Sequence, residues 1–161
     1  MSLLTATDLQ DFMRAHDIAG EIVRPGVPTP TVELAARALG VRPDQVLKSI
    51  LFLAGDRPVL AVACGTQRIE KSAIAGKYGI SRKRVRLATA EELIALSGYQ
   101  AGGMPPFGHS QALPTLIDSR AAALQTAYAG GGDESAMLRF KPAEILRVSP
   151  ACIVPLTSDS A

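Results

Sequence analysis

The 161-residue sequence lacks tryptophan, and only 4% of its residues are aromatic. We therefore expect an aliphatic core, and we expect more aromatic residues in a protein that stacks many bases on aromatic platforms. The two cysteines, Cys64 and Cys152, are isolated and form no C-x-x-C motif. This spacing argues against a disulfide framework or a zinc site and predicts reduced thiols in a cytosolic protein.

Signals of several other protein classes are also missing. The first residues have neither a basic nor a long apolar stretch, so no signal peptide is expected, and no apolar run approaches the length of a membrane span. There is no G-x-x-x-x-G-K-[ST] phosphate loop and no G-x-S-x-G nucleophile elbow. We therefore predict a cytoplasmic chain that needs no metal, no nucleotide cofactor and no conventional catalytic triad.

Length, 47% hydrophobic content and 20% charged residues fit one domain spanning residues 1–161. Hydrophobic spacing, caps and breakers predict helices at 7–15, 32–39, 69–78, 90–97 and 142–146. The same signals predict strands at 21–23, 49–54, 59–63, 115–118 and 137–140, a basic turn and short strand at 82–87, and a hairpin turn at 130–133. Residues 121–128 fit either helix or strand, and a loose tail is expected from about 149. Intermixed helices and strands indicate an α/β or α+β fold with a mixed sheet.

Residues 98–109, Gly-Tyr-Gln-Ala-Gly-Gly-Met-Pro-Pro-Phe-Gly-His, contain four glycines and two prolines. That composition excludes a helix or a central strand. Glycine permits close approach of a ligand to the backbone, while the proline pair stiffens the path. We interpret the stretch as an ordered loop that offers backbone groups to a small ligand; an ordinary surface loop is the alternative.

Two side chains near these features are candidates for chemistry. Lys48 directly precedes a buried strand, where a lysine either extends to water or binds a phosphate or carboxylate at a cleft. His109 directly follows the glycine–proline loop and is a better candidate than His16, although a lone histidine is more often structural. A backbone-lined loop with few reactive side chains suits the hydrolysis of an activated ester.

Seven basic residues lie between positions 68 and 86, with Glu70 as the one acid among them, although the net charge of the chain is only +2. This stretch could contact a phosphate backbone, or it could be a solvated helix face and turn. The basic residues are Arg68, Lys71, Lys77, Arg82, Lys83, Arg84 and Arg86.

Taken in order, these segments resemble the YbaK family of aminoacyl-tRNA editing proteins, which are related to the insertion domain of bacterial prolyl-tRNA synthetase. The matching segments are T-V-x-x-A-A from Thr31, L-K-S-I-L-F from Leu47, residues 85–87, G-Y-x-x-G-G-x-P-P-F-G from Gly98, and Ile117-Asp118. The resemblance covers about residues 31–146. It implies a mixed, partly barrel-like β-sheet flanked by helices. It also implies hydrolysis, in trans, of the ester between a wrong amino acid and the 3′-terminal adenosine of a tRNA.

The resemblance assigns roles to particular residues. It implies that Lys48, Gly102, Gly103 and Pro106 are the catalytic set. It implies a substrate-binding set of Thr31, Ser49, Gly98, Met104, Pro105, Phe107, Gly108, His109 and Asp118. We expect Arg68, Lys71, Lys77, Arg82, Lys83 and Arg84 to contact tRNA.

Two functional hypotheses follow. The first is a free-standing deacylase, since no synthetase body accompanies the domain, acting on tRNA-Pro that carries Cys, Ala or another small amino acid. The second is a non-catalytic module that binds a tRNA 3′ end, an aminoacyl-nucleotide or a synthetase. The expected partners are a charged tRNA and prolyl-tRNA synthetase, and the expected state is a monomer.

Overall fold

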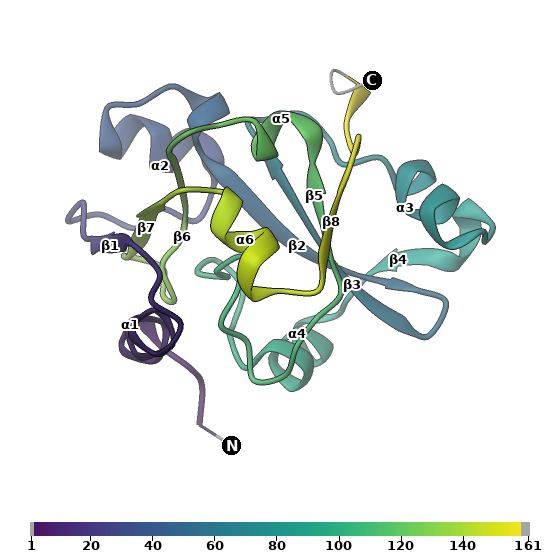
Figure 1. The fold of residues 1–161 in the computed structure, drawn as a ribbon, viewed down its shortest axis with the longest axis horizontal. Coiled ribbons are helices and arrows are strands. Elements are labelled where there is room, and N and C mark those ends of the chain that lie inside the picture. The colour runs from purple at the N-terminus through teal and green to yellow at the C-terminus, as the bar shows by residue number, and fades with distance from the viewer. Residues whose placement is uncertain (1, 159–161) are drawn as a thin grey trace.

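The computed structural model describes residues 2–158 of the chain (Figure 1). The helices are α1 (Ala6–Ala15), α2 (Val32–Leu39), α3 (Lys71–Tyr78), α4 (Ala90–Ser97), α5 (Ser119–Ala122) and α6 (Ala143–Val148), with 3-10 helices η1 (Pro43–Gln45) and η2 (Arg82–Arg84). The strands are β1 (Gly20–Val23), β2 (Leu47–Ala54), β3 (Arg57–Cys64), β4 (Val85–Leu87), β5 (Thr115–Asp118), β6 (Ala127–Gly130), β7 (Met137–Phe140) and β8 (Ala151–Val154).

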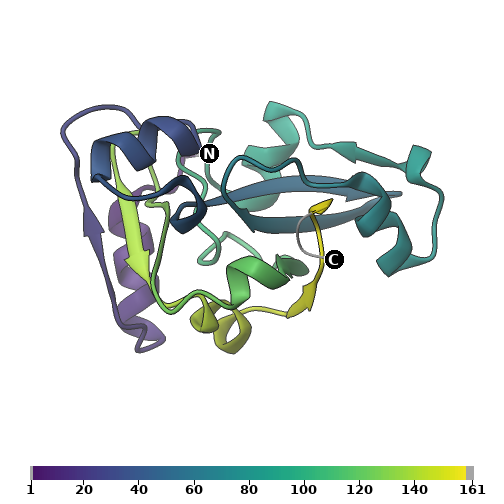
Figure 2. The ribbon, with the colours of Figure 1, turned by 90° about the horizontal axis from the view of Figure 1, so that it is seen from above.

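The strands form two sheets. The larger has the order β4-β2-β3-β5-β8, in which β4, β2 and β3 pair antiparallel and β3, β5 and β8 pair parallel. The smaller is antiparallel, with the order β1-β7-β6. An isolated parallel bridge between Val46 and Tyr128 links the sheets just before β2 begins. Figure 2 shows α2 and α3 toward opposite ends of the molecule.

The hairpin β2–β3 is the centre of the fold, and its side chains divide between two cores. Because successive side chains of a strand point to opposite faces, Leu47 and Leu51 join a core with α1 and the glycine–proline loop. Phe52 and Ala54 join a second core with α3. A smaller cluster beneath α2 contains Ala35 and Ala36. Nearly continuous burial of β3 explains why the sequence there reads as an unbroken apolar run.

The mixed fold predicted from the sequence is confirmed, and α2 and α4 begin and end at the predicted residues. In place of one partly barrel-like sheet, the described residues form the two sheets joined by the bridge. The ambiguous stretch 121–128 contains the end of α5 and the start of β6. Cys64 and Cys152 are free thiols. Among residues 2–158, no helix has both the length and the apolar character that a membrane crossing requires.

The expectation of a loose tail from about 149 is wrong for the described part of the tail. Residues 151–154 form β8, which pairs in parallel with β5. Leu156 is fully buried in the core beside α3. Its backbone N–H donates to Asp118 Oδ1 at 2.7 Å. The short apolar run Ile153–Val154 is too brief, and too close to prolines, to be recognised as a strand from the sequence.

Candidate functional site

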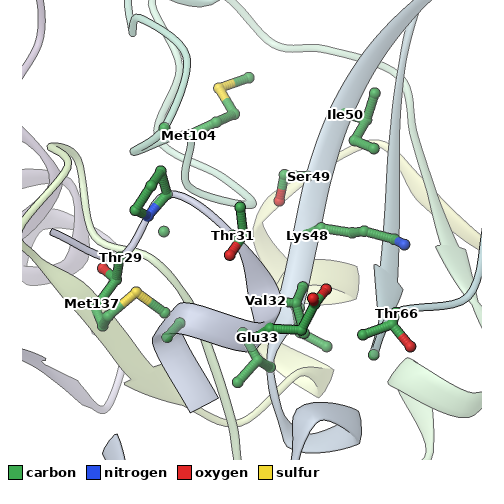
Figure 3. A pocket seen from close by; sticks show the side chains of 17 residues that line it. Thr29, Thr31, Val32, Glu33, Lys48, Ser49, Ile50, Thr66, Met104 and Met137 are labelled. Atoms are coloured by element: carbon green, nitrogen blue, oxygen red, sulfur yellow. The ribbon is translucent and has the colours of Figure 1, made fainter. Parts of the chain in front are cut away.

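A cavity of about 350 Å³ lies where the start of α2, the first half of β2 and the glycine–proline loop meet (Figure 3). Five of the residues proposed from the sequence line it: Thr31, Lys48, Ser49, Gly102 and Met104. They come from three separate segments of the chain, which the fold brings together. A cavity of this size can hold a small ligand group rather than a large cofactor.

The cavity borders an open edge of β2. Strand β4 pairs with residues 52–54 of β2, and the Leu51 carbonyl oxygen accepts a hydrogen bond from the Ala88 N–H at 3.0 Å. In an antiparallel pair, alternate residues direct their backbone groups to the same side. Ser49 lies two residues before Leu51, so its backbone N–H and C=O face the side that β4 leaves uncovered. The edge therefore offers main-chain donors and acceptors next to the cavity.

Lys48 and Ser49 are consecutive, and their side chains leave β2 in opposite directions (Figure 3). The Lys48 ammonium donates a hydrogen bond to the backbone carbonyl of Gln67, beyond the end of β3. Burial lowers the pKa of Lys48, and the neighbouring Cys64 and Glu33 oppose this shift. The hydrogen bond holds the ammonium at one side of the cavity with donors to spare, because a lysine has three N–H groups.

The Ser49 hydroxyl is buried and has no hydrogen-bond partner within residues 2–158. An unsatisfied buried hydroxyl costs free energy, and this one belongs to a side chain that lines the cavity. A ligand in the cavity could supply the missing partner. Thr31, at the start of α2, is already engaged, since its hydroxyl accepts from the Leu34 N–H at 3.2 Å.

The glycine–proline loop reaches the cavity through Gly102 and Met104, and it is held there by the triple glycine that begins with the last residue of β6. Gly103 lies so close to this second loop that a Cβ on it would come within 2.6 Å of the Asp133 backbone. A Cβ on Gly130 would lie 2.3 Å from the Met104 carbonyl oxygen. The Gly132 N–H donates to the Gly103 carbonyl at 2.9 Å. Both loops therefore need glycine where they touch.

The later residues of the glycine–proline loop, also predicted as site residues, are not among those that line the cavity. Phe107 is buried and stacks on Phe12, with ring centroids 5.8 Å apart. His109 Nε2 lies 2.8 Å from the Pro105 carbonyl oxygen. Since a carbonyl only accepts, Nε2 must carry the proton. Burial lowers the pKa of His109 to about 4, against the opposing effect of the Pro105 bond. The neutral imidazole thus ties the loop together from behind.

The other predicted site residues do not line the cavity either. Gly98 lies beside Leu4 and Ser110, and Pro106 and Gly108 sit within the folded loop. Asp118 is buried at the end of β5, where it caps α5 through the Arg120 N–H and holds the Leu156 N–H. In this structure these residues support the loop or the sheet around the cavity.

The cavity also has lining residues that the sequence alone does not suggest. Glu33 and Thr66 stand near Lys48, and Met137 faces Met104 across the apolar part (Figure 3). Gly130, which the sequence predicts to belong to a hairpin turn, also lines it. Gly130 and Met137 reach the cavity through the long-range packing of β6 and β7 beside it, which leaves no local pattern in the sequence. Within residues 2–158 no cluster of three or more potential metal ligands is present.

The basic stretch runs along the larger sheet away from the cavity. Arg68 follows Thr66 of the cavity wall by two residues, whereas Arg84 adjoins the β2–β3 turn, where its carbonyl accepts from the Gly55 N–H. The length of β2 separates these ends by about 20 Å. Arg86 forms two 2.8 Å hydrogen bonds with Glu92. The six residues predicted to contact tRNA have no ion pair in the described part of the chain.

Comparisons with known proteins agree on one family. Residues 27–148 match the family model described as the aminoacyl-tRNA editing domain. An Enterococcus faecalis protein named as a candidate Cys-tRNA(Pro)/Cys-tRNA(Cys) deacylase, EbsC, is 24% identical over 129 residues, which cover 80% of this chain and 77% of that protein. Proline–tRNA ligase of Lactobacillus gasseri is 26% identical over 133 residues, which cover 82% of this chain but 23% of the ligase.

A solved structure gives the same result. The crystal structure of a candidate trans-editing enzyme for prolyl-tRNA synthetase superposes with a TM-score of 0.86 and 28% sequence identity. The match covers 95% of this chain and 96% of that chain. The similarity of fold therefore extends over nearly the whole chain.

Proposed function

Because the chain belongs to the aminoacyl-tRNA editing domain family, we propose that it is a trans-acting aminoacyl-tRNA deacylase. Its substrate is the ester between a small amino acid and the 3′ end of a tRNA, with tRNA-Pro carrying Cys or Ala as the first candidates. The similarity to EbsC and to the candidate trans-editing enzyme over most of their lengths supports action in trans. It also supports prolyl-tRNA synthetase as the enzyme whose errors are corrected.

The observation that carries the proposal is the convergence of Lys48 and Ser49 of β2 with Gly102 and Met104 of the loop on one cavity. Lys48 supplies a fixed positive charge for the terminal nucleotide. Backbone groups of the loop and of the β2 edge can hold the ester carbonyl and the attacking water. Fixed donors of this kind stabilise the developing oxyanion without rearranging during the reaction. No metal is needed for this step.

The size and polarity of the cavity support a small amino acid. Val32, Met104 and Met137 belong to its apolar part. A volume of about 350 Å³ must hold the acyl group together with part of the terminal ribose. The six basic residues from Arg68 to Arg84 are proposed to contact the tRNA backbone, because they carry positive charge from the cavity mouth along the sheet without ion-pair partners in the described chain.

The test is a deacylation panel on tRNA-Pro charged separately with Ala, Cys, Ser and Pro. We expect selective release of one small amino acid, with Pro spared. Lys48→Ala is expected to lower kcat/KM by about 100-fold or more, the scale of removing an electrostatic interaction with the reacting group, while tRNA binding changes little. Lys141→Ala, at an exposed lysine that directly follows β7, is the matched control. Binding of charged tRNA without release of any amino acid would favour a non-catalytic module instead.

A further inference from the structure

Two charged side chains, Lys48 and Glu33, are found among the described residues that line the cavity. Glu33 lies in the first turn of α2 and is exposed. Its carboxylate points toward the side of the cavity on which Lys48 lies (Figure 3). The two groups are close enough to interact electrostatically. The site therefore carries one positive and one negative charge at its mouth.

Lys48 does not neutralise Glu33 through a direct contact. The lysine ammonium hydrogen-bonds to the Gln67 carbonyl. In the part of the chain that the structure describes, Glu33 forms no ion pair within 4 Å and no side-chain hydrogen bond. Its carboxylate oxygens are therefore available to a ligand in the cavity. A carboxylate accepts hydrogen bonds only, so its partner must be a donor, and a cationic donor is favoured over a neutral one.

We propose that Glu33 binds the α-ammonium group of the aminoacyl ester. This inference rests on the proposed deacylase function and narrows its substrate class to esters with a free amino group. The free α-amino group of a peptide has a pKa of about 7.7–8.0, so a substantial fraction of an aminoacyl ester is cationic in neutral or mildly acidic solution. Glu33 then favours aminoacyl-tRNA over N-blocked esters such as peptidyl-tRNA.

Helix stabilisation is the competing explanation for Glu33, because a carboxylate in the first turn interacts favourably with the helix dipole. Thr31 already caps α2, and Glu33 adds charge there. The chain contains a matched case in α4, where Thr89 is the cap and the exposed Glu91 lies in the first turn. Glu91 is not among the residues that line the cavity. Glu91→Gln therefore removes the same kind of helix interaction without touching the site.

The experiment compares alanyl-tRNA with lactyl-tRNA, in which a hydroxyl group replaces the ammonium group at nearly constant size. Wild-type protein, Glu33→Gln and Glu91→Gln are assayed on both esters, and each rate is divided by the uncatalysed rate of the same ester. If alanine is not the amino acid released in the panel, the accepted amino acid and its α-hydroxy counterpart are used. For each protein, the preference is the corrected rate on the aminoacyl ester divided by the corrected rate on the hydroxy ester. The wild-type preference divided by that of Glu33→Gln isolates the interaction between residue 33 and the ammonium group.

We expect wild-type kcat/KM to favour the aminoacyl ester, and Glu33→Gln to reduce that preference by about 3- to 10-fold, as for a charge interaction that is only partly shielded from water. Glu91→Gln is expected to keep the wild-type preference. An unchanged preference in Glu33→Gln, or an equal reduction in Glu91→Gln, would overturn the inference. Failure of the wild-type protein to release any amino acid would instead contradict the deacylase function, and this inference with it.

Discussion

His109 allows a stability prediction whose magnitude follows from the structure. The imidazole is tied to the Pro105 carbonyl at 2.8 Å and packs edge-on against the buried Tyr99 ring. Burial lowers its pKa from 6.5 to about 4. Between these values the unfolded chain binds a proton at His109 and the folded chain does not. Acidification through this range therefore favours unfolding.

A lowering from 6.5 to about 4 corresponds to at most about 3 kcal/mol of unfolding free energy. This contribution is fully present above pH 6.5 and is lost as the pH falls toward 4. Carboxylates with lowered pKa values, such as Glu92 at about 2, lose their contribution mainly below this range. We therefore expect His109 to make the largest single contribution to the decrease in stability between pH 6.5 and 4.

The assay is urea unfolding at a series of pH values for wild-type protein and His109→Gln, in which the amide can still donate to the Pro105 carbonyl. We expect the variant to be less stable near neutral pH, because the packing changes, but to lose about 2–3 kcal/mol less between pH 6.5 and 4. His16→Gln, at an exposed position, is the control. Parallel pH profiles for wild-type protein and His109→Gln would refute the reasoning.

Two further predictions concern the loops and the basic stretch. Gly103→Ala places a Cβ within 2.6 Å of the Asp133 backbone and is expected to destabilise the fold by about 1–3 kcal/mol and to abolish deacylation. Gly76→Ala, in α3 with open space around it, is expected to stabilise the fold by about 0.5–1 kcal/mol. Urea unfolding of both variants at neutral pH measures these changes. Replacing all three residues of η2 by alanine is expected to weaken tRNA binding. It is also expected to reduce the slope of log K against log salt concentration by about 0.7–0.9 for each phosphate group that the variant no longer binds; an unchanged slope would argue against binding of tRNA by η2.

The elements of the fold were largely predictable because their signals are local. Thr31 and Gly40 mark the ends of α2, and Thr89 and Gly98 mark those of α4 through side-chain capping and left-handed C-caps. Strand β8 was not predicted, because its four residues form a strand through their pairing with β5. That pairing is a property of the assembled sheet.

Some residues that line the cavity were named from the family pattern, namely Lys48, Gly102 and Met104. The sequence did not reveal which residues of the same motif face away from the cavity. Phe107 and His109 follow Met104 closely in the sequence. Two prolines lie between Met104 and Phe107, and the Phe107 side chain packs in the core. A glycine separates Phe107 from His109. Glu33 stands at an unspecified position of the T-V-x-x-A-A segment, so the pattern did not single it out. Met137 reaches the cavity through packing between segments that lie far apart in the chain, for which no local pattern exists.

The open edge of β2 connects the fold to the proposed chemistry. An uncovered edge strand exposes main-chain groups that can pair with another chain, and proteins usually cover or blunt such edges. Here β4 pairs with residues 52–54 of β2. Next to residues 48–50, the cavity lies between β2, α2 and the glycine–proline loop, and all three segments line it. A longer β4 would complete the sheet and occupy the backbone groups of Ser49. The shortness of β4, which ends at Leu87 just before Thr89 caps α4, thus leaves the main-chain groups of Ser49 without a β4 partner in the described part of the chain, on the side where the cavity lies.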